Sequence, residues 1–247
     1  MRNRVLWAYI VFVHGLLVLA LAKSDVLSRL ERRLGFRPAP EITDHFGRMV
    51  SYHIRMDGHV PAGAVVFIGA SHTQGLATDA VAMPSVNYGI GGDTTVGALI
   101  RLPRYRSLDR AAAVVLSLGM NDLARRGNDE IVANYQRILS ALPPGLPIVV
   151  TALFPVDAAS TTDPLPSVSN ARIAGVNSAL ESLCATDPRC VFVDVGPRLT
   201  DKAGNLSKAN HVGDGVHLSD EGYRIWIEGL RNALLTAKGR PAPRGGQ

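Results

Sequence analysis

Four short runs of apolar residues lie in the middle and C-terminal parts of the chain, and polar or turn-forming residues bound each one. They span residues 64–68, 111–118, 148–153 and 191–195. Continuous apolar runs of this length are typical of strands that are buried on both faces, as in a parallel sheet. Stretches with helical character lie between and after these runs, at 72–81, 128–141, 168–186 and 219–237. Because strands that alternate with helices form βαβ units, the pattern predicts an α/β fold with a central parallel sheet.

A fifth apolar stretch stands at the N-terminus and has a different character. Residues 5–22 are apolar except for His14, and two arginines precede them. Eighteen helical residues span about 27 Å, close to the roughly 30 Å of bilayer hydrocarbon. We therefore expect a signal anchor or a signal peptide over residues 1–22, that is, an N-terminal transmembrane or signal helix. Ala20-Leu21-Ala22 fits a signal-peptidase site, so cleavage stays open, although the length favours the anchor.

The remaining chain divides into three parts. Residues 23–60 are predicted to be a helical connector, because leucines at helical spacing and a second helical stretch at 42–56 flank a Pro-Ala-Pro break. Residues 61–237 hold the alternating pattern and form one domain. Residues 238–247 are rich in Pro, Gly and Arg and are expected to be a disordered tail.

The charge distribution narrows the choice of partners. The net charge is +5, but residues 1–60 carry +4, residues 61–235 carry −2 and the tail carries +3. A nucleic-acid enzyme would more often carry a basic stripe on its working domain, so no nucleic-acid partner is expected. Basic flanks beside an apolar helix instead favour contact with anionic lipid headgroups, so the membrane is an expected partner through the N-terminal helix.

The compartment depends on two opposing signals. The basic residues after the apolar stretch favour a cytoplasmic domain by the positive-inside rule. Cys184 and Cys190 flank a short loop and are a candidate disulfide pair, which would persist in an oxidising compartment; two reduced thiols are the alternative. We expect a membrane-anchored or exported domain on the extracytoplasmic side, with orientation left open.

Ser71 and a glycine-rich segment follow the first apolar run. Ser71 comes two residues after Gly69, where a helix should begin, so its backbone N–H lies where negative charge is favoured. An ordinary helix-capping serine is the alternative. The segment 86–95 has three glycines around Ile90, and exposed N–H groups in such a loop can bind an oxyanion. Its spacing does not match the phosphate-binding loops, and a plain turn is the alternative.

Two further motifs carry polar side chains. Asn121 directly follows the run 111–118 and can aim its amide into the same cleft, unless it only caps a helix. Asp214 stands three residues before His217, where a carboxylate can fix the tautomer of the imidazole and leave its other nitrogen as a base. His211 is the rival base, but Asp214 suits His217 better. His72 is expected on the surface or behind the site, with its side chain pointing away from Ser71.

The order Ser, Gly, Asn and Asp-x-x-His resembles the four blocks of the SGNH/GDSL hydrolase superfamily. The segment Asn87-Tyr88-Gly89-Ile90-Gly91-Gly92-Asp93-Thr94-Thr95 is similar to its platelet-activating-factor acetylhydrolase-like branch. The resemblance implies a three-layer flavodoxin-like sandwich over an SGNH hydrolase domain at 61–237. It assigns the residues of a triad and an oxyanion hole: Ser71 as nucleophile, His217 as base, Asp214 as its partner, and the N–H groups of Ser71 and Gly92 with the Asn121 side chain as oxyanion donors.

Two positions depart from the family pattern. Ala70 stands where the family carries an Asp, and Met120 stands where a small residue is common, so Met120 should narrow the acyl pocket. We expect a serine esterase that hydrolyses short-acyl esters of a small molecule, glycan or lipid through an acyl-enzyme. No metal and no cofactor are expected, since no Cys/His cluster has ligand spacing. The alternatives are an O-acetyltransferase on cell-envelope glycans, a lysophospholipase, and a catalytically silent envelope-binding module.

Overall fold

The structure, a computed structural model, describes residues 4, 6–7, 9–10, 12–15, 41–161 and 168–239. The chain separates into two compact units, Met1–Glu41 and Ile42–Gln247. No helix in the described part is both long and apolar enough to cross a membrane. The segment 1–22, predicted to be an anchor or signal, lies largely outside the described residues, and so does most of the predicted tail 238–247.

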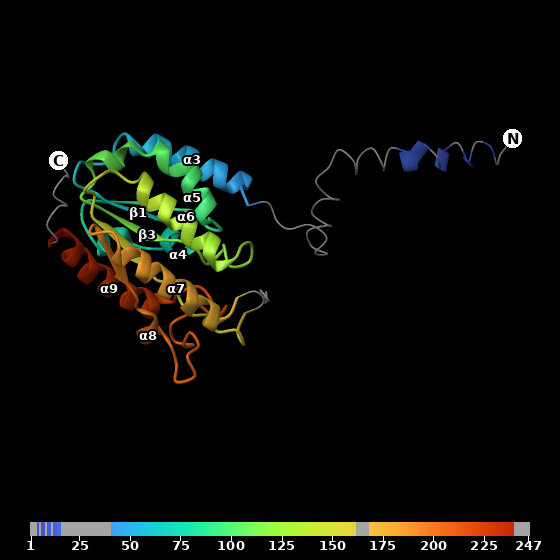
Figure 1. Ribbon diagram of the computed structural model, residues 1–247. Coiled ribbons are helices and arrows are strands. Elements are labelled where there is room, and N and C mark those ends of the chain that lie inside the picture. Colours follow the sequence, from blue (N-terminus) through green and yellow to red (C-terminus); the bar gives the residue numbers. More distant parts are fainter. Residues whose placement is uncertain are drawn as a thin grey trace. The chain divides into compact units, whose positions relative to one another are not determined.

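In the residues that the structure describes, five parallel strands form one sheet in the order β2-β1-β3-β4-β5. Figure 1 labels β1 and β3 of this sheet. This order, 2-1-3-4-5, is that of flavodoxin-like doubly wound sheets. The strands are β1 (Val65–Gly69), β2 (Ser85–Gly89), β3 (Ala113–Ser117), β4 (Ile148–Thr151) and β5 (Cys190–Val193). The apolar runs predicted four of them. The sequence analysis missed β2, because Ser85 and Asn87 interrupt its apolar pattern, as is usual in a strand at the edge of a sheet.

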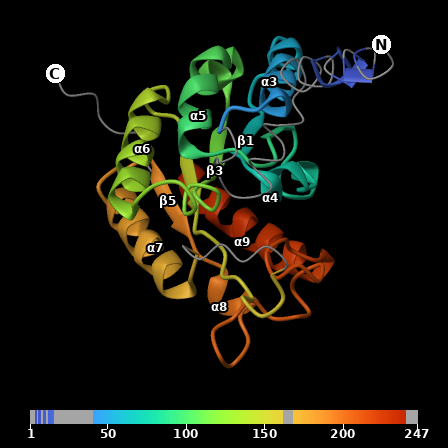
Figure 2. The same ribbon diagram turned by 90° about the vertical axis from the view of Figure 1, so that its right-hand side faces the viewer.

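Helices cover both faces of the sheet, and successive residues of a strand serve opposite faces. From β1, Val66 and Ile68 join the cluster of buried residues that includes side chains of α5 (Thr95–Arg101), α6 (Asn128–Ala141) and α7 (Asn170–Ala185). Val65 and Phe67 join the opposite cluster, which includes α9 (Asp220–Gly239) and α8 (Gly196–Leu199) (Figure 2). Strands buried on both faces explain the continuous apolar runs of the sequence.

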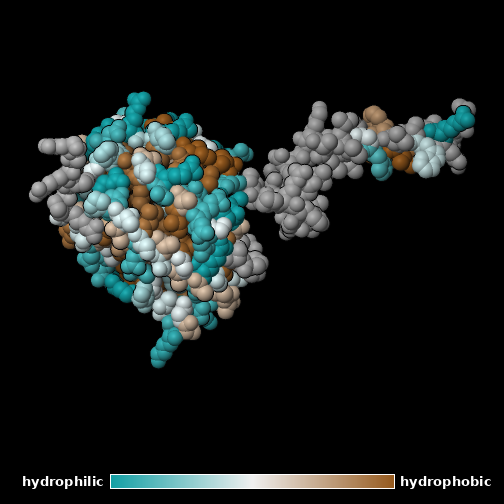
Figure 3. Space-filling view, in the orientation of Figure 1, coloured by the Kyte–Doolittle hydropathy of each residue, from teal (hydrophilic) through white to brown (hydrophobic). Residues whose placement is uncertain are grey.

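Polar side chains, short connecting helices and a disulfide are the remaining features of the domain. Figure 3 shows hydrophilic side chains over much of one face, with apolar side chains gathered between them. Short 3-10 helices connect the larger elements, among them η1 (Thr78–Ala80), η2 (Leu102–Arg104) and η3 (Arg106–Arg110). A disulfide joins Cys184, in the last turn of α7, to Cys190, the first residue of β5.

Helix α3 (Asp44–Asp57) belongs to the domain and not to a connector. Its side chains Phe46 and Val50 form a buried cluster with Ile90 of the glycine-rich segment. At its end, the buried Asp57 accepts a hydrogen bond of 2.8 Å from the hydroxyl of Tyr88. The compact unit begins at Ile42, so it includes α3 as well as the predicted domain that starts at residue 61.

The helix expected over residues 72–81 is also shorter than predicted. Helix α4 (Ser71–Gln74) ends after one turn, and η1 follows it. Its last residue packs closely against β2: a Cβ atom on Gly89 would lie 2.6 Å from Gln74 Cα. The backbone of α4 thus lies directly on the last residue of β2.

This contact predicts that Gly89→Ala destabilises the domain. The added methyl group must push α4 away from β2, and overpacking of this kind costs about 1–3 kcal/mol. Urea unfolding measures the loss. Gly58→Ala is the control, because Gly58 has φ −62° and no atom within 4 Å of an added Cβ. Equal stability of the two variants would contradict the prediction.

Candidate active site

Three neighbouring strands end in the loops that carry the candidate residues. Ser71 is the first residue of α4 and follows β1, Gly92 follows β2, and Asn121 follows β3. These strands are parallel and adjacent in the order β2-β1-β3, so their carboxyl ends meet at one edge of the sheet. Ligands of open α/β sheets bind at such an edge, beside the point where the strand order reverses.

A fourth loop brings a histidine and a carboxylate to Ser71. His217 Nε2 lies 3.0 Å from Ser71 Oγ, and His217 Nδ1 lies 2.6 Å from Asp214 Oδ2. Both distances are within hydrogen-bond range. The three residues predicted from the sequence are therefore brought together, although 146 positions separate Ser71 from His217.

Asp214 also shapes the backbone of its own loop. Its Oδ1 accepts hydrogen bonds of 2.9 Å from the N–H groups of Val216 and His217. Burial by itself would raise the pKa of Asp214, but these bonds and the bond from the His217 ring outweigh it and lower the pKa to about 2. The carboxylate is therefore ionised at neutral pH and orients the imidazole with Nε2 toward Ser71.

His72 lies behind His217 rather than on the surface. Its side chain is buried, and its Nε2–H donates to the carbonyl of Val216 at 3.0 Å. The two imidazole centroids are 5.4 Å apart, and the edge of the His72 ring meets Phe154 at 5.0 Å. Burial lowers the pKa of His72 to about 4; the hydrogen bond to Val216 raises it, and the nearby His217 lowers it further.

The rival base lies elsewhere. His211 is buried, and its Nε2 is 3.6 Å from Asp157 Oδ2. Its Nδ1 faces backbone N–H groups of its own loop. His217, and not His211, therefore makes the contact with Ser71.

Two of the candidate oxyanion donors, Gly92 and Asn121, lie in linked loops. Gly92 has φ +79°, a left-handed conformation that favours glycine. The Asn121 amide donates to the carbonyl of Asp93 at 2.9 Å, which ties the loop after β3 to the glycine-rich loop. An amide nitrogen carries a second hydrogen, which can serve a ligand. Backbone and amide N–H groups of this kind can stabilise a developing negative oxygen.

A buried ion pair beneath these loops was not foreseen from the sequence. Arg101 is fully buried, and its guanidinium donates to Asp93 Oδ2 at 2.8 Å, to the Tyr88 carbonyl at 2.7 Å and to the Gly69 carbonyl at 3.2 Å. One side chain thus joins the last residue of β1, the end of β2 and the glycine-rich loop. The sequence shows only that Arg101 follows the short apolar stretch 96–100, which does not distinguish a buried arginine from an exposed one.

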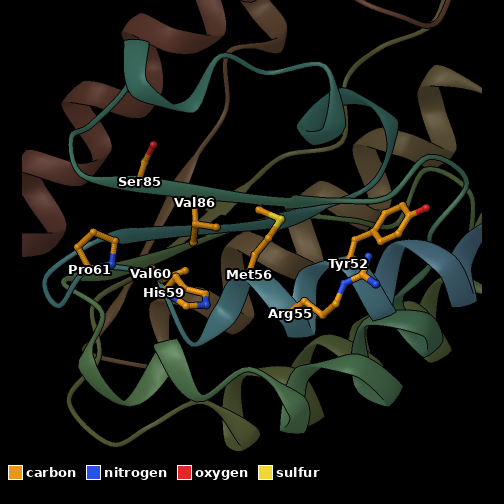
Figure 4. A pocket seen from close by; sticks show the side chains of 8 residues that line it. All are labelled: Tyr52, Arg55, Met56, His59, Val60, Pro61, Ser85 and Val86. Carbon is orange, nitrogen blue, oxygen red and sulfur yellow. The ribbon is translucent and has the colours of Figure 1, made fainter.

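Two hollows of the described surface differ in their relation to Ser71. One, of about 680 Å³, lies between α3 and the first residues of β2 (Figure 4), at the end of β2 opposite to the glycine-rich loop. Figure 4 shows Tyr52, Arg55 and Met56 of α3 beside it. A hollow of only about 20 Å³ adjoins the candidate site, and its lining includes Ala70, His72 and Met120.

In the described part of the chain, no group of three or more His, Cys, Asp or Glu residues could hold a metal ion.

The chain matches the model of a known protein family and is similar to several solved structures. The model of the GDSL-like lipase/acylhydrolase family matches residues 62–225. No curated protein matches the chain. A Streptococcus pneumoniae structure named after platelet activating factor has a TM-score of 0.74 at 23% identity, over 86% of this chain and 100% of that one.

Two similar structures have names that state an activity. An acetyl-xylooligosaccharide esterase from Geobacillus stearothermophilus has a TM-score of 0.53 at 19% identity, over 75% of this chain and 99% of that one. The catalytic domain of peptidoglycan O-acetyltransferase A from Streptococcus pneumoniae has a TM-score of 0.53 at 18% identity, over 73% and 97%. At these identities the likeness concerns the fold.

The buried His72 predicts an acid-sensitive stability. Its pKa is about 4 in the folded protein, below the ordinary 6.5 of a histidine in an unfolded chain, so the unfolded chain binds the proton first. The free energy of unfolding should therefore fall as the pH drops from 6.5 to 4, by up to about 3 kcal/mol from this residue. His72→Gln, which keeps an N–H donor, should reduce the fall.

Urea unfolding at pH 7 and pH 4.5 measures the difference. His53, whose pKa burial also lowers to about 4, should retain its share of the fall in this variant. His45→Gln, at an exposed position, is the control. An unchanged difference between the two pH values in His72→Gln would disprove the assignment.

Proposed function

The chain belongs to the GDSL-like lipase/acylhydrolase family and is a hydrolase; from this premise we propose that it is a serine esterase that uses Ser71, His217 and Asp214. The observation that carries the proposal is the unbroken line of hydrogen bonds from Ser71 Oγ through the His217 ring to Asp214. This is the arrangement in which an imidazole can take a proton from a serine hydroxyl.

The proposed reaction proceeds in two acyl transfers. His217 Nε2 takes the proton from Ser71 as Oγ forms a bond to the ester carbonyl carbon. The carbonyl oxygen becomes an oxyanion that the N–H groups of Ser71, Gly92 and Asn121 stabilise, each by about 3 kcal/mol. When the intermediate collapses, the bond to the alcohol breaks and His217 returns the proton to it. Water then attacks the acyl-enzyme by the same steps and releases the acid.

The two sides of the site favour an ester with a small acyl group and a large alcohol. The hollow lined by Ala70, His72 and Met120 has about 20 Å³, room for little more than a methyl group. The base is open to solvent by contrast: the side chains of His217 and Asp214 are 47% and 36% exposed. An acetylated glycan meets both conditions, and the fold shared with an acetyl-xylooligosaccharide esterase supports it.

The same openness favours a second candidate, an O-acetyltransferase. A sugar hydroxyl that approaches the exposed face of His217 can replace water in the second step. The fold shared with a peptidoglycan O-acetyltransferase domain supports this alternative. Release of free acetate from an acetylated oligosaccharide, compared with transfer to an added sugar, distinguishes the two.

Removal of the nucleophile or the base should abolish turnover of p-nitrophenyl acetate. We expect Ser71→Ala and His217→Ala each to lose at least about 10³-fold in kcat, and the double variant to be little worse, because triad members act as a unit. His59→Ala is the control, since this exposed histidine lies at the remote hollow. Full activity of a folded Ser71→Ala protein would contradict the proposal.

The narrow hollow predicts a preference for acetyl to butyryl esters. Values of kcat/KM should fall gradually from C2 to C12, because one methylene changes binding in a tight pocket by only about 1–3 kcal/mol. Met120→Ala should flatten the fall, since Met120 lines the hollow. An optimum at C8 or longer in the unaltered protein would favour the lysophospholipase alternative instead.

A further inference from the structure

A second histidine lies inside the loop that carries Asp214 and His217. The loop is closed at its base by an antiparallel bridge between His211 and Leu218, and Val212 N–H donates to the His217 carbonyl at 3.0 Å. The His211 side chain has only 3% of its surface exposed. Its ring therefore fills the interior of the loop, whereas Asp214 and His217 are on the exposed side.

The His211 ring is an acceptor for the loop backbone. Its Nδ1 lies 3.0 Å from the N of Gly213 and 3.1 Å from the N of Gly215. Both N–H groups donate, so Nδ1 carries no proton and the ring proton is on Nε2, which faces Asp157 Oδ2 at 3.6 Å. These two glycines flank Asp214, and both have the left-handed backbone, with φ +104° and +73°.

The same loop is held from outside by the segment after β4. Asp157 N–H donates to the Gly215 carbonyl at 2.8 Å. A Cβ atom on Gly215 would overlap the Asp157 carbonyl, so the two segments are in close contact. The backbone of Gly215 is therefore fixed on two sides. The Gly215 N–H donates to the His211 ring, and the Gly215 carbonyl accepts from the Asp157 N–H.

We propose that His211 is a positioning residue for the reaction: its unprotonated Nδ1 holds the backbone on both sides of Asp214, and this directs Asp214 and the His217 ring toward Ser71. The inference rests on the proposed function, because it concerns the geometry of that triad. It gives His211 a role other than the one considered from the sequence, in which His211 was the rival base. Without the acceptor, the N–H groups of Gly213 and the buried Gly215 lose their partner, and the turn must rearrange to find others.

Two variants of similar size test the role of the acceptor. Asn places its amide oxygen near the position of Nδ1, whereas Gln extends toward the position of Nε2. We expect His211→Asn to keep kcat for p-nitrophenyl acetate within about threefold, and His211→Gln to lose roughly 10²-fold with KM nearly unchanged, as for a misplacement of about 1 Å. The rate at which a fluorophosphonate labels Ser71 should fall in parallel. Val212→Ala is the control, because Val212 is adjacent in the same loop and 65% exposed.

Urea unfolding of each variant separates positioning from stability, since kcat is compared only where the protein is fully folded. Equal activity of His211→Gln and the unaltered protein, with Ser71→Ala inactive, overturns the role of His211 and leaves the proposed function intact. Full activity of Ser71→Ala overturns both.

A measurement on the unaltered protein covers the case in which His211→Gln does not fold. The ¹⁵N resonance of His211 Nδ1 at neutral pH should be that of an unprotonated nitrogen, with scalar couplings across hydrogen bonds to the amides of Gly213 and Gly215. A proton on Nδ1, or the absence of both couplings, would show that this ring does not hold the loop.

Discussion

The geometry of the candidate site depends on one buried guanidinium. Arg101 has no exposed surface, and its hydrogen bonds reach the ends of two strands and the carboxylate of Asp93 in the glycine-rich loop. A buried ion pair is seldom a net source of stability, but removal of one partner leaves an uncompensated charge and costs about 3–5 kcal/mol. The pair therefore specifies an arrangement: where Asp93 lies decides where its neighbour Gly92 lies, and the Asn121 amide follows through its bond to the Asp93 carbonyl.

A second set of bonds connects the two distant parts of the chain that supply the nucleophile and the base. The hydroxyl of Tyr223, in α9, donates to the His72 carbonyl at 2.9 Å, and the His72 ring donates to the carbonyl of Val216 at 3.0 Å. The residue next to Ser71 thus bonds directly to the residue next to His217. These bonds do not involve the segment after β4, whose contact with Gly215 is a separate support of the same loop.

Local patterns in the sequence identified what local chemistry determines. The four apolar runs became strands because both faces of the sheet are covered, and the Asp-x-x-His spacing identified a pair that lies within one short loop. The errors came from contacts between distant segments. Strand β2 has polar residues at an edge, α4 packs closely on Gly89, and α3 packs against Ile90. Likewise, nothing near His72 or Arg101 in the sequence indicates that each is buried.

The disulfide between Cys184 and Cys190 spans only six positions. Closure of so short a loop contributes about 2 kcal/mol in the chain-entropy description, a minor share of the 5–15 kcal/mol typical of a domain. The bond connects the end of α7 to the first residue of β5, whereas Ser71 follows β1 at the carboxyl edge of the sheet. Its reduction would loosen a corner of the fold and leave the carboxyl edge in place. The oxidation state of these cysteines therefore reports the redox conditions to which the protein has been exposed. The reaction at Ser71 does not depend on it.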